Sequence, residues 1–390
     1  MNPILSAKLA RIQLASLAIG LVAGVACVIG AATGARQFYF SYLSALMFWG
    51  GLGLGCLAVT MIHHLTGGRW GYPIRRILEA GFMTLPLMLP LFVPIFFGLG
   101  RLYPWARPAE VAAAEDLRYR AAYENEPGYI IRQIIFLLVF ICFAFLLRRW
   151  SCEQDLTTDA EPTRKARALS GAGIVVYGLV GTFACIDWIL SLENHWYSTM
   201  FGVIFLIGQI LAAYAFGVVA LAFVRNWEPF TKIVQPVHYH HLGNLMLTFV
   251  LFWTYVSFGQ LLIIYSGDIP HETEWYRHRI AGDWKFLIGA IALFHFFLPF
   301  LLLLFRAVKK HAVSLTALAA VLLLMRVADS YWLVMPTLHQ HGVAISWMDF
   351  AAFIAVGGLW LAWFVACLKA RPLVPVNDPG LQFSFVYAEA

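Results

Sequence analysis

The sequence predicts an all-α, polytopic membrane protein with about ten transmembrane helices. Hydrophobic residues make up 61% of the 390 residues and charged residues only 12%, whereas a soluble globular protein has roughly 25% charged residues. The mean hydropathy is +0.75. Apolar runs long enough to cross about 30 Å of hydrocarbon recur along the whole chain. We place the helices at residues 12–34, 39–62, 75–99, 129–149, 168–192, 199–224, 242–266, 284–307, 313–336 and 344–368.

The first apolar run, from Ile12 to about Gly34, follows Lys8 and Arg11 and has the outline of a secretory signal. A signal's hydrophobic segment has roughly 7–15 residues, and this run is longer. We therefore interpret it as the first transmembrane helix.

Basic residues decide the orientation of the other nine helices. Most of the 27 Lys and Arg residues lie at the N-terminus, in the second-to-third, fourth-to-fifth, sixth-to-seventh and eighth-to-ninth loops, and after the tenth helix. Because basic loops stay in the cytoplasm, both termini are predicted to be cytoplasmic. The net charge of +6 is spread over these short loops, which argues against nucleic acid as a partner.

Two loops on the opposite side are long and carry mixed charge, at residues 101–128 and 267–283. They are either solvated surfaces or docking surfaces for extracytoplasmic proteins. Each lies between the second and third helix of a four-helix unit, which predicts two repeated four-helix bundles plus two flanking helices. The expected division is the first transmembrane helix in 1–38, helices two to five in 39–198, helices six to nine in 199–340, and the last helix and tail in 341–390.

The end of the fifth helix carries the most informative stretch, Asp187-Trp188-Ile189-Leu190-Ser191-Leu192-Glu193-Asn194-His195-Trp196-Tyr197-Ser198-Thr199. It places three ionisable side chains where hydrocarbon gives way to water. Such groups are costly in a bilayer, so they indicate a role in moving protons, ions or a polar substrate. Asp187 has no cation within one turn of its own helix, so we expect its partner on another helix.

Other ionisable residues lie at different depths, counted at 1.5 Å per residue. Glu79 lies at the cytoplasmic end, His295 near the middle, and Arg326 and Asp329 in the outer half. Together with Asp187 they form a candidate proton pathway, in which Arg326 shares a helical face with Asp329 and tunes it. The alternatives stay open: Glu79 as an interfacial group, Arg326 with Asp329 as a structural pair, and His295 as a core histidine.

The sequence contains no pattern for a redox centre or a metal. The six cysteines form no C-x-x-C pair, and His295 has no second histidine at its depth to complete an axial haem pair. We therefore expect no metal and no cofactor held by this chain. Electrons that enter or leave would have to use other subunits.

The stretch from Asp187 to Thr199, followed by Phe201-Gly202-Val203, resembles the D-W-I-M-S-L-E-x-H-W-Y-S-T signature of the ActF-type subunit of alternative complex III. This second quinone-binding-type subunit of quinol:cytochrome c oxidoreductase is one of the polysulfide-reductase NrfD-like membrane proteins. The resemblance continues through His238-Tyr239-His240-His241-Leu242-Gly243-Asn244 and Arg326-Val327-Ala328-Asp329, and it spans the chain up to about Gly380.

The resemblance implies a subunit of a quinol-oxidising respiratory complex in the bacterial inner membrane. Its partners would be an NrfD-like sister subunit, an iron–sulfur subunit, cytochrome c subunits with haem c, lipid, and a terminal oxidase. In such complexes the sister subunit is the better candidate for quinol oxidation, and the ActF-type subunit conducts protons. A quinone or menaquinone site at Asp187, Glu193 and His195 is the rival prediction, with a structural scaffold or a transporter as further alternatives.

Overall fold

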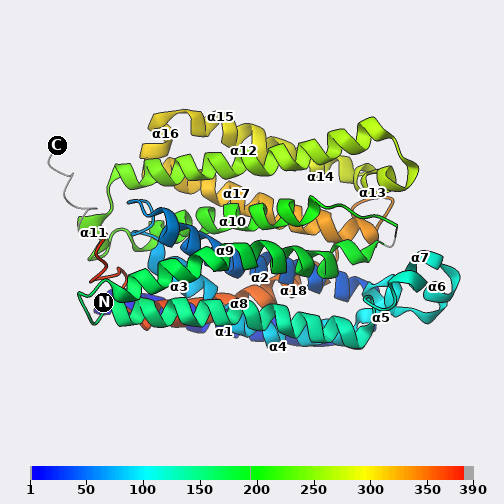
Figure 1. Ribbon diagram of the computed structural model, residues 1–390, viewed down its shortest axis with the longest axis horizontal. Helices are drawn as coiled ribbons and strands as arrows, with labels where there is room; N and C mark the ends of the chain where they lie inside the picture. The colour runs from blue at the N-terminus through cyan, green and yellow to red at the C-terminus, as the bar shows by residue number, and fades with distance from the viewer. Residues whose placement is uncertain (1, 194, 382–390) are drawn as a thin grey trace.

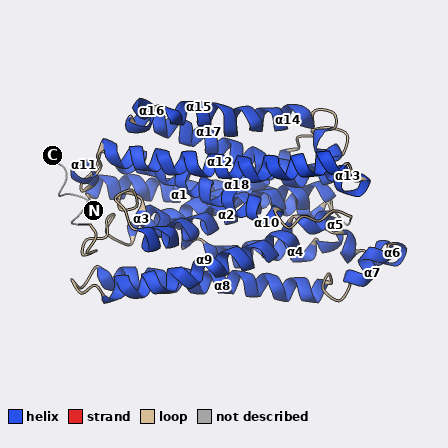
Figure 2. Ribbon diagram, turned by 45° about the horizontal axis from the view of Figure 1, so that its top comes forward, coloured by secondary structure: helices blue, strands red, loops and turns tan. Residues whose placement is uncertain are grey.

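The computed structural model describes residues 2–193 and 195–381, and in these residues every regular element is a helix. Figure 1 shows the long helices side by side along the long axis of the molecule. Figure 2 shows the same arrangement with only helices and loops. The start of α1, α11 and the end of the described chain lie together, and α5, α6, α7 and α13 lie at the opposite end. We name these the inner end and the outer end.

Ten helical segments in the described residues are long and apolar enough to cross a membrane, which confirms the fold class. They are α1 (Pro3–Ala32), α2 (Arg36–Thr66), α3 with α4 (Arg75–Phe82 and Leu85–Phe97), α8 (Glu126–Gln154), α9 with η2 (Glu161–Trp188 and Leu190–Leu192), α10 (Phe201–Val224), α12 (Pro236–Gly267), α14, η3 and α15 (Trp284–Ile291, Ala292–Phe297 and Leu298–Leu304), α17 with η4 (Ala312–Val334 and Met335–Thr337) and α18 (Trp347–Lys369). Several begin earlier than predicted because a helix continues into water, where polar residues are tolerated and hydropathy gives no signal.

Short helices connect the long ones at both ends. Those at the outer end are α5 (Leu99–Leu102), η1 (Pro104–Ala106), α6 (Pro108–Ala113), α7 (Glu115–Arg120) and α13 (Pro270–Ile280). Those at the inner end are α11 (Phe230–Ile233) and α16 (Arg306–Lys310). The two long outer loops of the sequence are therefore mostly helical.

Two predicted helices are interrupted rather than continuous. The third is divided at Met83 and Thr84, just before Pro86, which has no N–H for the carbonyl four residues earlier. The eighth contains the π-helix η3, followed by Pro299. Pro299 cannot bond the carbonyl of His295, and a local π turn accommodates that missing bond.

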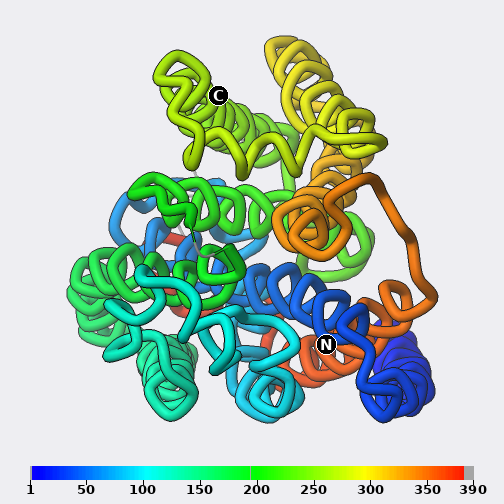
Figure 3. The backbone as a smooth tube through the Cα atoms, turned by 90° about the vertical axis from the view of Figure 1, so that its right-hand side faces the viewer, coloured from blue at the N-terminus to red at the C-terminus, as the bar shows by residue number. Residues whose placement is uncertain are grey.

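The long helices pack as two groups that meet at α2 and α10. In the first bundle α2 packs with α3, α4 and α9, and α8 packs with α4 and α9. In the second bundle α10, α12, α14 to α15 and α17 pack together. Buried residues make up 89% of an apolar 18-residue stretch of α2 and 78% of one in α10. These two helices therefore form the centre. Figure 3 shows the arrangement from the outer end.

The flanking helices α1 and α18 pack on one another, and α18 also contacts α2. A Cβ atom on Gly20 would lie 2.9 Å from the backbone nitrogen of Leu359. The two helix backbones are therefore in direct contact, as small residues permit between membrane helices. The exact division at residues 38, 198 and 340 stays a prediction.

Candidate functional site

Asp187 lies buried at the outer end of α9 and is bonded to α8. Its Oδ2 accepts hydrogen bonds from Arg132 Nε at 2.8 Å and from Gln133 Nε2 at 2.9 Å. The partner of Asp187 that we expected on another helix is therefore Arg132 of α8. Arg132 also donates to the carbonyl of Tyr123. The amide oxygen of Gln133 accepts from the indole of Trp188.

Two buried tyrosines continue this first-bundle network. The hydroxyls of Tyr103 and Tyr129 lie 3.1 Å apart, and Tyr103 also donates to the carbonyl of Trp188. Asp187, Gln133, Tyr103 and Tyr129 therefore all have hydrogen-bond partners within the chain. A network of this kind fixes α8, α9 and the η1 segment relative to one another.

Glu79 lies buried at the inner end and is enclosed by cations. Its carboxylate bonds to Arg75 at 3.2 Å, Arg76 at 2.6 Å and Arg148 at 3.1 Å, and it accepts from Ser151 at 2.6 Å. Three guanidinium groups around one carboxylate favour its charged form. Both oxygens of Glu79 are occupied by protein donors.

The arginines of this cluster also bind acids outside the membrane segments. Arg76 pairs with Asp155, and Arg75 pairs with Asp378 of the segment after α18. The amide of Asn377 donates to the carbonyl of Asp155 at 2.8 Å. The last described residues are therefore tied over the inner end of the first bundle.

Arg326 and Asp329 form a buried pair in the second bundle. Arg326 Nη1 donates to Asp329 Oδ2 at 2.7 Å, and both side chains are 4% exposed. The Arg326 guanidinium packs against α10, since a Cβ atom on Gly208 would lie 2.3 Å from Nη2. The pair thus lies between α17 and the central helix α10, about 12 Å from the outer end of α17, eight residues from Val334.

His295 lies in η3, which packs against α17, the helix that carries this pair. It is fully buried, and its ring centroid lies 4.2 Å from that of Trp253 on α12. The imidazole nitrogens, Trp253 Nε1 and Ser257 Oγ are all buried and have no hydrogen-bond partner among the described residues.

Polar side chains continue from His295 toward the outer end along α12. Ser257 is one turn from Trp253, and Gln260 follows on the same side of α12. Gln260 accepts from Ser198 at 2.5 Å and donates to Tyr276 of α13 at 3.0 Å. Polar side chains therefore follow one side of α12 from the middle of the second bundle to its outer end.

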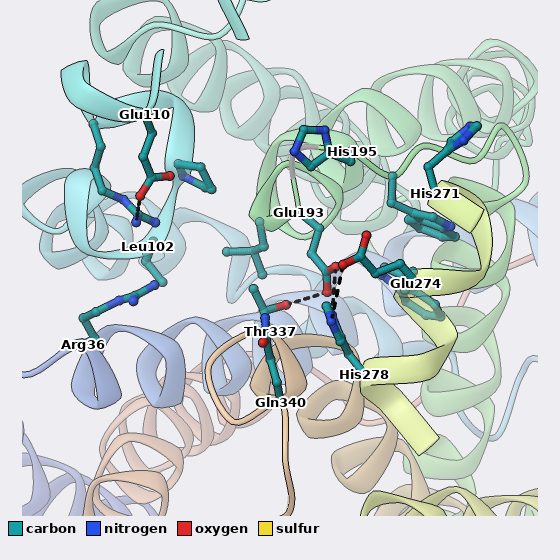
Figure 4. A pocket seen from close by; sticks show the side chains of 15 residues that line it. Arg36, Leu102, Glu110, Glu193, His195, His271, Glu274, His278, Thr337 and Gln340 are labelled. Carbon is teal, nitrogen blue, oxygen red and sulfur yellow. Dashed lines mark hydrogen bonds and ion pairs between the residues drawn. The ribbon is translucent and has the colours of Figure 1, made fainter. Parts of the chain in front are cut away.

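Glu193 and His195 line a cavity of about 300 Å³ at the outer end. Figure 4 shows Glu193, His278 and Glu274 on one side of it, and Arg36 and Glu110 on the other. Asp187 is not among the residues that line it.

Arg279 lies behind the wall of this cavity and binds Glu193, which lines it. Arg279 Nη1 lies 2.6 Å from Glu193 Oε1, which also accepts from Thr337 at 3.1 Å. Burial raises the pKa of Glu193, but the charge of Arg279 and the contacts with His278 outweigh it and lower the pKa to about 2. Arg279 is itself buried, over the ring of Trp275. Glu193 follows the last helix of the first bundle, and this ion pair joins it to the second.

His195 has a different environment from Glu193. It is 60% exposed, and its Nδ1 lies 3.2 Å from Asp116 of α7. Asn194, between the two residues, lies outside the described part of the chain. The predicted quinone site is therefore divided: Glu193 and His195 share the cavity, and Asp187 belongs to the α8–α9 network.

The structure likewise separates the five residues of the predicted proton pathway. Arg326, Asp329 and His295 lie together in the second bundle, whereas Asp187 and Glu79 lie at opposite ends of the first. Sequence reasoning identified the acids and paired Asp329 with Arg326 correctly, but it did not name the partners that lie on other helices. The side chains that it missed are Arg132, Gln133, Arg148, Trp253, Ser257 and Arg279.

The histidines near the inner end do not form a metal site. His63 bonds the carbonyl of Gly68, and His238 caps its own helix by accepting from the Gln235 N–H. Among residues 2–193 and 195–381, no three His, Cys, Asp or Glu side chains are placed to hold a metal ion together. The expected absence of a cofactor stays a prediction.

Neither protein-family models nor curated proteins match this chain. The resemblance to the ActF-type subunits therefore rests on the residues quoted above. What the structure establishes is the all-α, multi-pass membrane architecture and the geometry of its buried polar groups.

Proposed function

We propose that this chain is an integral membrane subunit of a quinol-oxidising respiratory complex and that it conducts protons through its second bundle. In this proposal Asp329 and His295 exchange protons with internal water, and Arg326 sets the proton affinity of Asp329. Haem c and iron–sulfur clusters belong to partner subunits, and an NrfD-like sister subunit oxidises the quinol.

One observation carries the proton-conducting part of this proposal. Buried polar atoms in folded proteins are nearly always hydrogen-bonded to protein or to ordered water. The nitrogens of His295, the Trp253 indole and the Ser257 hydroxyl lack partners among the described residues, and η3, which carries His295, packs against the helix of a buried Arg–Asp pair. Water is the partner that such a polar site accepts. A titratable pair next to ordered water has the components of a proton relay.

The partners are tested by purifying the tagged chain from its native membrane in mild detergent. An iron–sulfur protein and a c-type cytochrome should be recovered with it in fixed ratio, with a haem c absorption spectrum. Recovery of the chain alone, without haem or iron, would exclude the respiratory-complex assignment and favour a transporter.

The orientation is tested at Cys152, in the basic inner end of α8. The proposal places this end in the cytoplasm of a bacterial cell. A membrane-impermeant thiol reagent should label Cys152 in inside-out vesicles but not in intact spheroplasts. The fully buried Cys56 and Cys185 serve as internal controls. Labelling in spheroplasts would reverse the direction of the path.

The outer cavity favours a second candidate, direct quinol binding by this chain. A carboxylate and histidines around a cavity of about 300 Å³ match the small end of typical ligand pockets. Under this alternative, Glu193→Gln in the assembled complex should weaken binding of a quinone analogue. Unchanged binding would leave quinol oxidation to the sister subunit.

A further inference from the structure

Among the described residues, α12, α15 and α17 offer no buried polar route from the inner end of the second bundle to His295. The pair of Lys309 and Asn244, 2.7 Å apart, lies at its inner end. Between that pair and His295, the fully buried side chains of α12, α15 and α17 are apolar: Met246, Val250, Leu303 and Leu322. A proton that leaves at the outer end must therefore reach Arg326 and His295 from another direction.

The central helix α10 offers that direction at the depth of Arg326. Gln209 is 3% exposed and follows Gly208, the residue against which the Arg326 guanidinium packs. Gln209 lies eight residues from the start of α10, about 12 Å from its outer end, as Arg326 does on α17. Its Oε1 accepts from Tyr177 of α9 at 3.2 Å, while its Nε2 has no partner within residues 2–193 and 195–381.

Two glycines of α2 lie against Gln209. A Cβ atom on Gly51 would lie 3.0 Å from Nε2 of the Gln209 side chain. A Cβ atom on Gly55 would lie 2.1 Å from the backbone carbonyl oxygen of Gln209. The glycines let the two central helices approach closely enough to bury Gln209 between the bundles. An amide donor held there without a partner is costly unless water or a ligand accepts its hydrogen bond.

Further buried polar atoms without partners lie nearer the inner end of α10. Tyr214, five residues nearer that end than Gln209, has a buried hydroxyl with no partner among the described residues. Its ring packs on Phe249 of α12 and on Trp70, which also contacts His63. The Nδ1 of His63, near the inner end of α2, likewise has no partner in the described part of the chain.

We infer that Gln209 holds ordered water at the junction of the two bundles, and that protons reach the Arg326, Asp329 and His295 group across this junction from Tyr214, nearer the inner end of α10. The inference rests on the proposed function and specifies its inner half. Gln209 does not titrate; its amide orients water, so that a proton entering that water from the Tyr214 side is released on the Arg326 side. The path runs through the centre of the molecule and does not pass through Glu79, both of whose oxygens are already occupied.

The test compares four variants of the assembled complex in vesicles, scored as protons released per electron transferred. Gln209→Leu removes the amide at similar volume, and Tyr214→Phe removes only the unpaired hydroxyl. Both should lower the ratio by at least half, with electron transfer kept close to the wild-type rate. Gln209→Asn keeps an amide and leaves room for one more water, so it should restore most of the ratio. Tyr42→Phe, which removes a buried hydroxyl bonded to the carbonyl of Leu91, should leave the ratio unchanged.

The outcomes separate this inference from the proposed function. A wild-type ratio in both Gln209→Leu and Tyr214→Phe, together with a low ratio in Asp329→Asn, overturns the junction and leaves proton conduction in place. A wild-type ratio in Asp329→Asn overturns both. If Gln209→Leu does not assemble, Tyr214→Phe decides, because loss of an unpaired hydroxyl removes no bond that holds the fold. Density for water beside Gln209 Nε2 in an experimental structure of the complex is also required, and a dry contact there would contradict the junction.

Discussion

Asp187 and Asp329 occupy comparable places in the two bundles but have opposite environments. Each lies near the outer end of the last helix of its bundle, with a tryptophan close by in sequence. Asp187 is held by Arg132 and Gln133 from a neighbouring helix. Asp329 is held by Arg326 of its own helix, and His295, in the adjacent η3, has no hydrogen-bond partner among the described residues.

A buried acid is therefore not, by itself, evidence of proton transfer. In the first bundle the protein supplies hydrogen bonds to Asp187, Gln133, Tyr103 and Tyr129, which connects the helices rigidly. The indole nitrogen of Trp105, stacked on Tyr103, has no partner among the described residues. In the second bundle the protein leaves donors and acceptors open, and water must complete them. We therefore propose structural anchoring for the first bundle and proton conduction for the second.

The largest expected loss of stability comes from Glu79→Gln. The substitution leaves two buried guanidinium groups, and the partly buried one of Arg148, without their shared carboxylate. Breaking a buried ion pair in this way costs roughly 3–5 kcal/mol. The matched control is Glu153→Gln, whose pair with Arg149 is 42% and 73% exposed and should cost less than about 1 kcal/mol. Unfolding in detergent mixtures, followed by tryptophan fluorescence, measures both. Equal stability of the two variants would contradict an anchoring role for the first-bundle cluster.

Glu193→Gln should have the next largest effect, because Glu193 joins the bundles through Arg279. Its pKa is about 2 in the folded chain, against an ordinary value of 4.5, which corresponds to roughly 3 kcal/mol of stabilisation. Since the folded pKa is depressed, this stabilisation is complete above pH 4.5 and is lost as pH falls toward 2.

The pH dependence supplies the measurement for this pair. The difference in unfolding free energy between wild type and Glu193→Gln should be constant from neutral pH down to 4.5 and should shrink below it. Glu110→Gln is the control, because Glu110 pairs with Arg107 at the surface and is 42% exposed. A difference that vanishes near neutral pH would show that the pair does not hold the bundles together.

The smallest effect distinguishes two buried serines. Ser170 in the first bundle donates to the carbonyl of Ala166 at 2.7 Å, so Ser170→Ala should cost about 1 kcal/mol. Ser257 in the second bundle has no protein partner, so Ser257→Ala should change stability by less than about 0.5 kcal/mol while slowing proton release. Equal destabilisation by the two substitutions would indicate that the second bundle is as fully bonded as the first.

The sequence predicted the helices because hydrocarbon thickness imposes a minimum length on every apolar segment. It also selected Asp187 and Asp329, since an acid in such a segment is conspicuous. It did not predict the interruptions at Met83 and in η3 from Pro86 and Pro299, although proline chemistry was the available signal. The central position of α2 was hidden because its hydropathy resembles that of the lipid-facing helices.

Side-chain partners on other helices could not be predicted from the sequence for a different reason. Arg132 lies 55 residues from Asp187 in sequence, and its role depends on how α8 packs on α9. Gln209 carries no charge, so nothing in the sequence marks it as a candidate. Its proposed role follows only from its contacts with the glycines of α2 and from the position of Arg326. Which polar atoms remain unpaired is a property of packing alone.

The most direct test compares Asp329→Asn with Asp187→Asn in fully assembled complexes reconstituted into vesicles. The amide preserves the shape of the carboxyl group and cannot titrate. We expect Asp329→Asn to lower the number of protons released per electron while electron transfer continues, and Asp187→Asn to keep the wild-type ratio at reduced stability. A wild-type ratio in Asp329→Asn, or the loss of proton release only in Asp187→Asn, would contradict proton conduction through the second bundle.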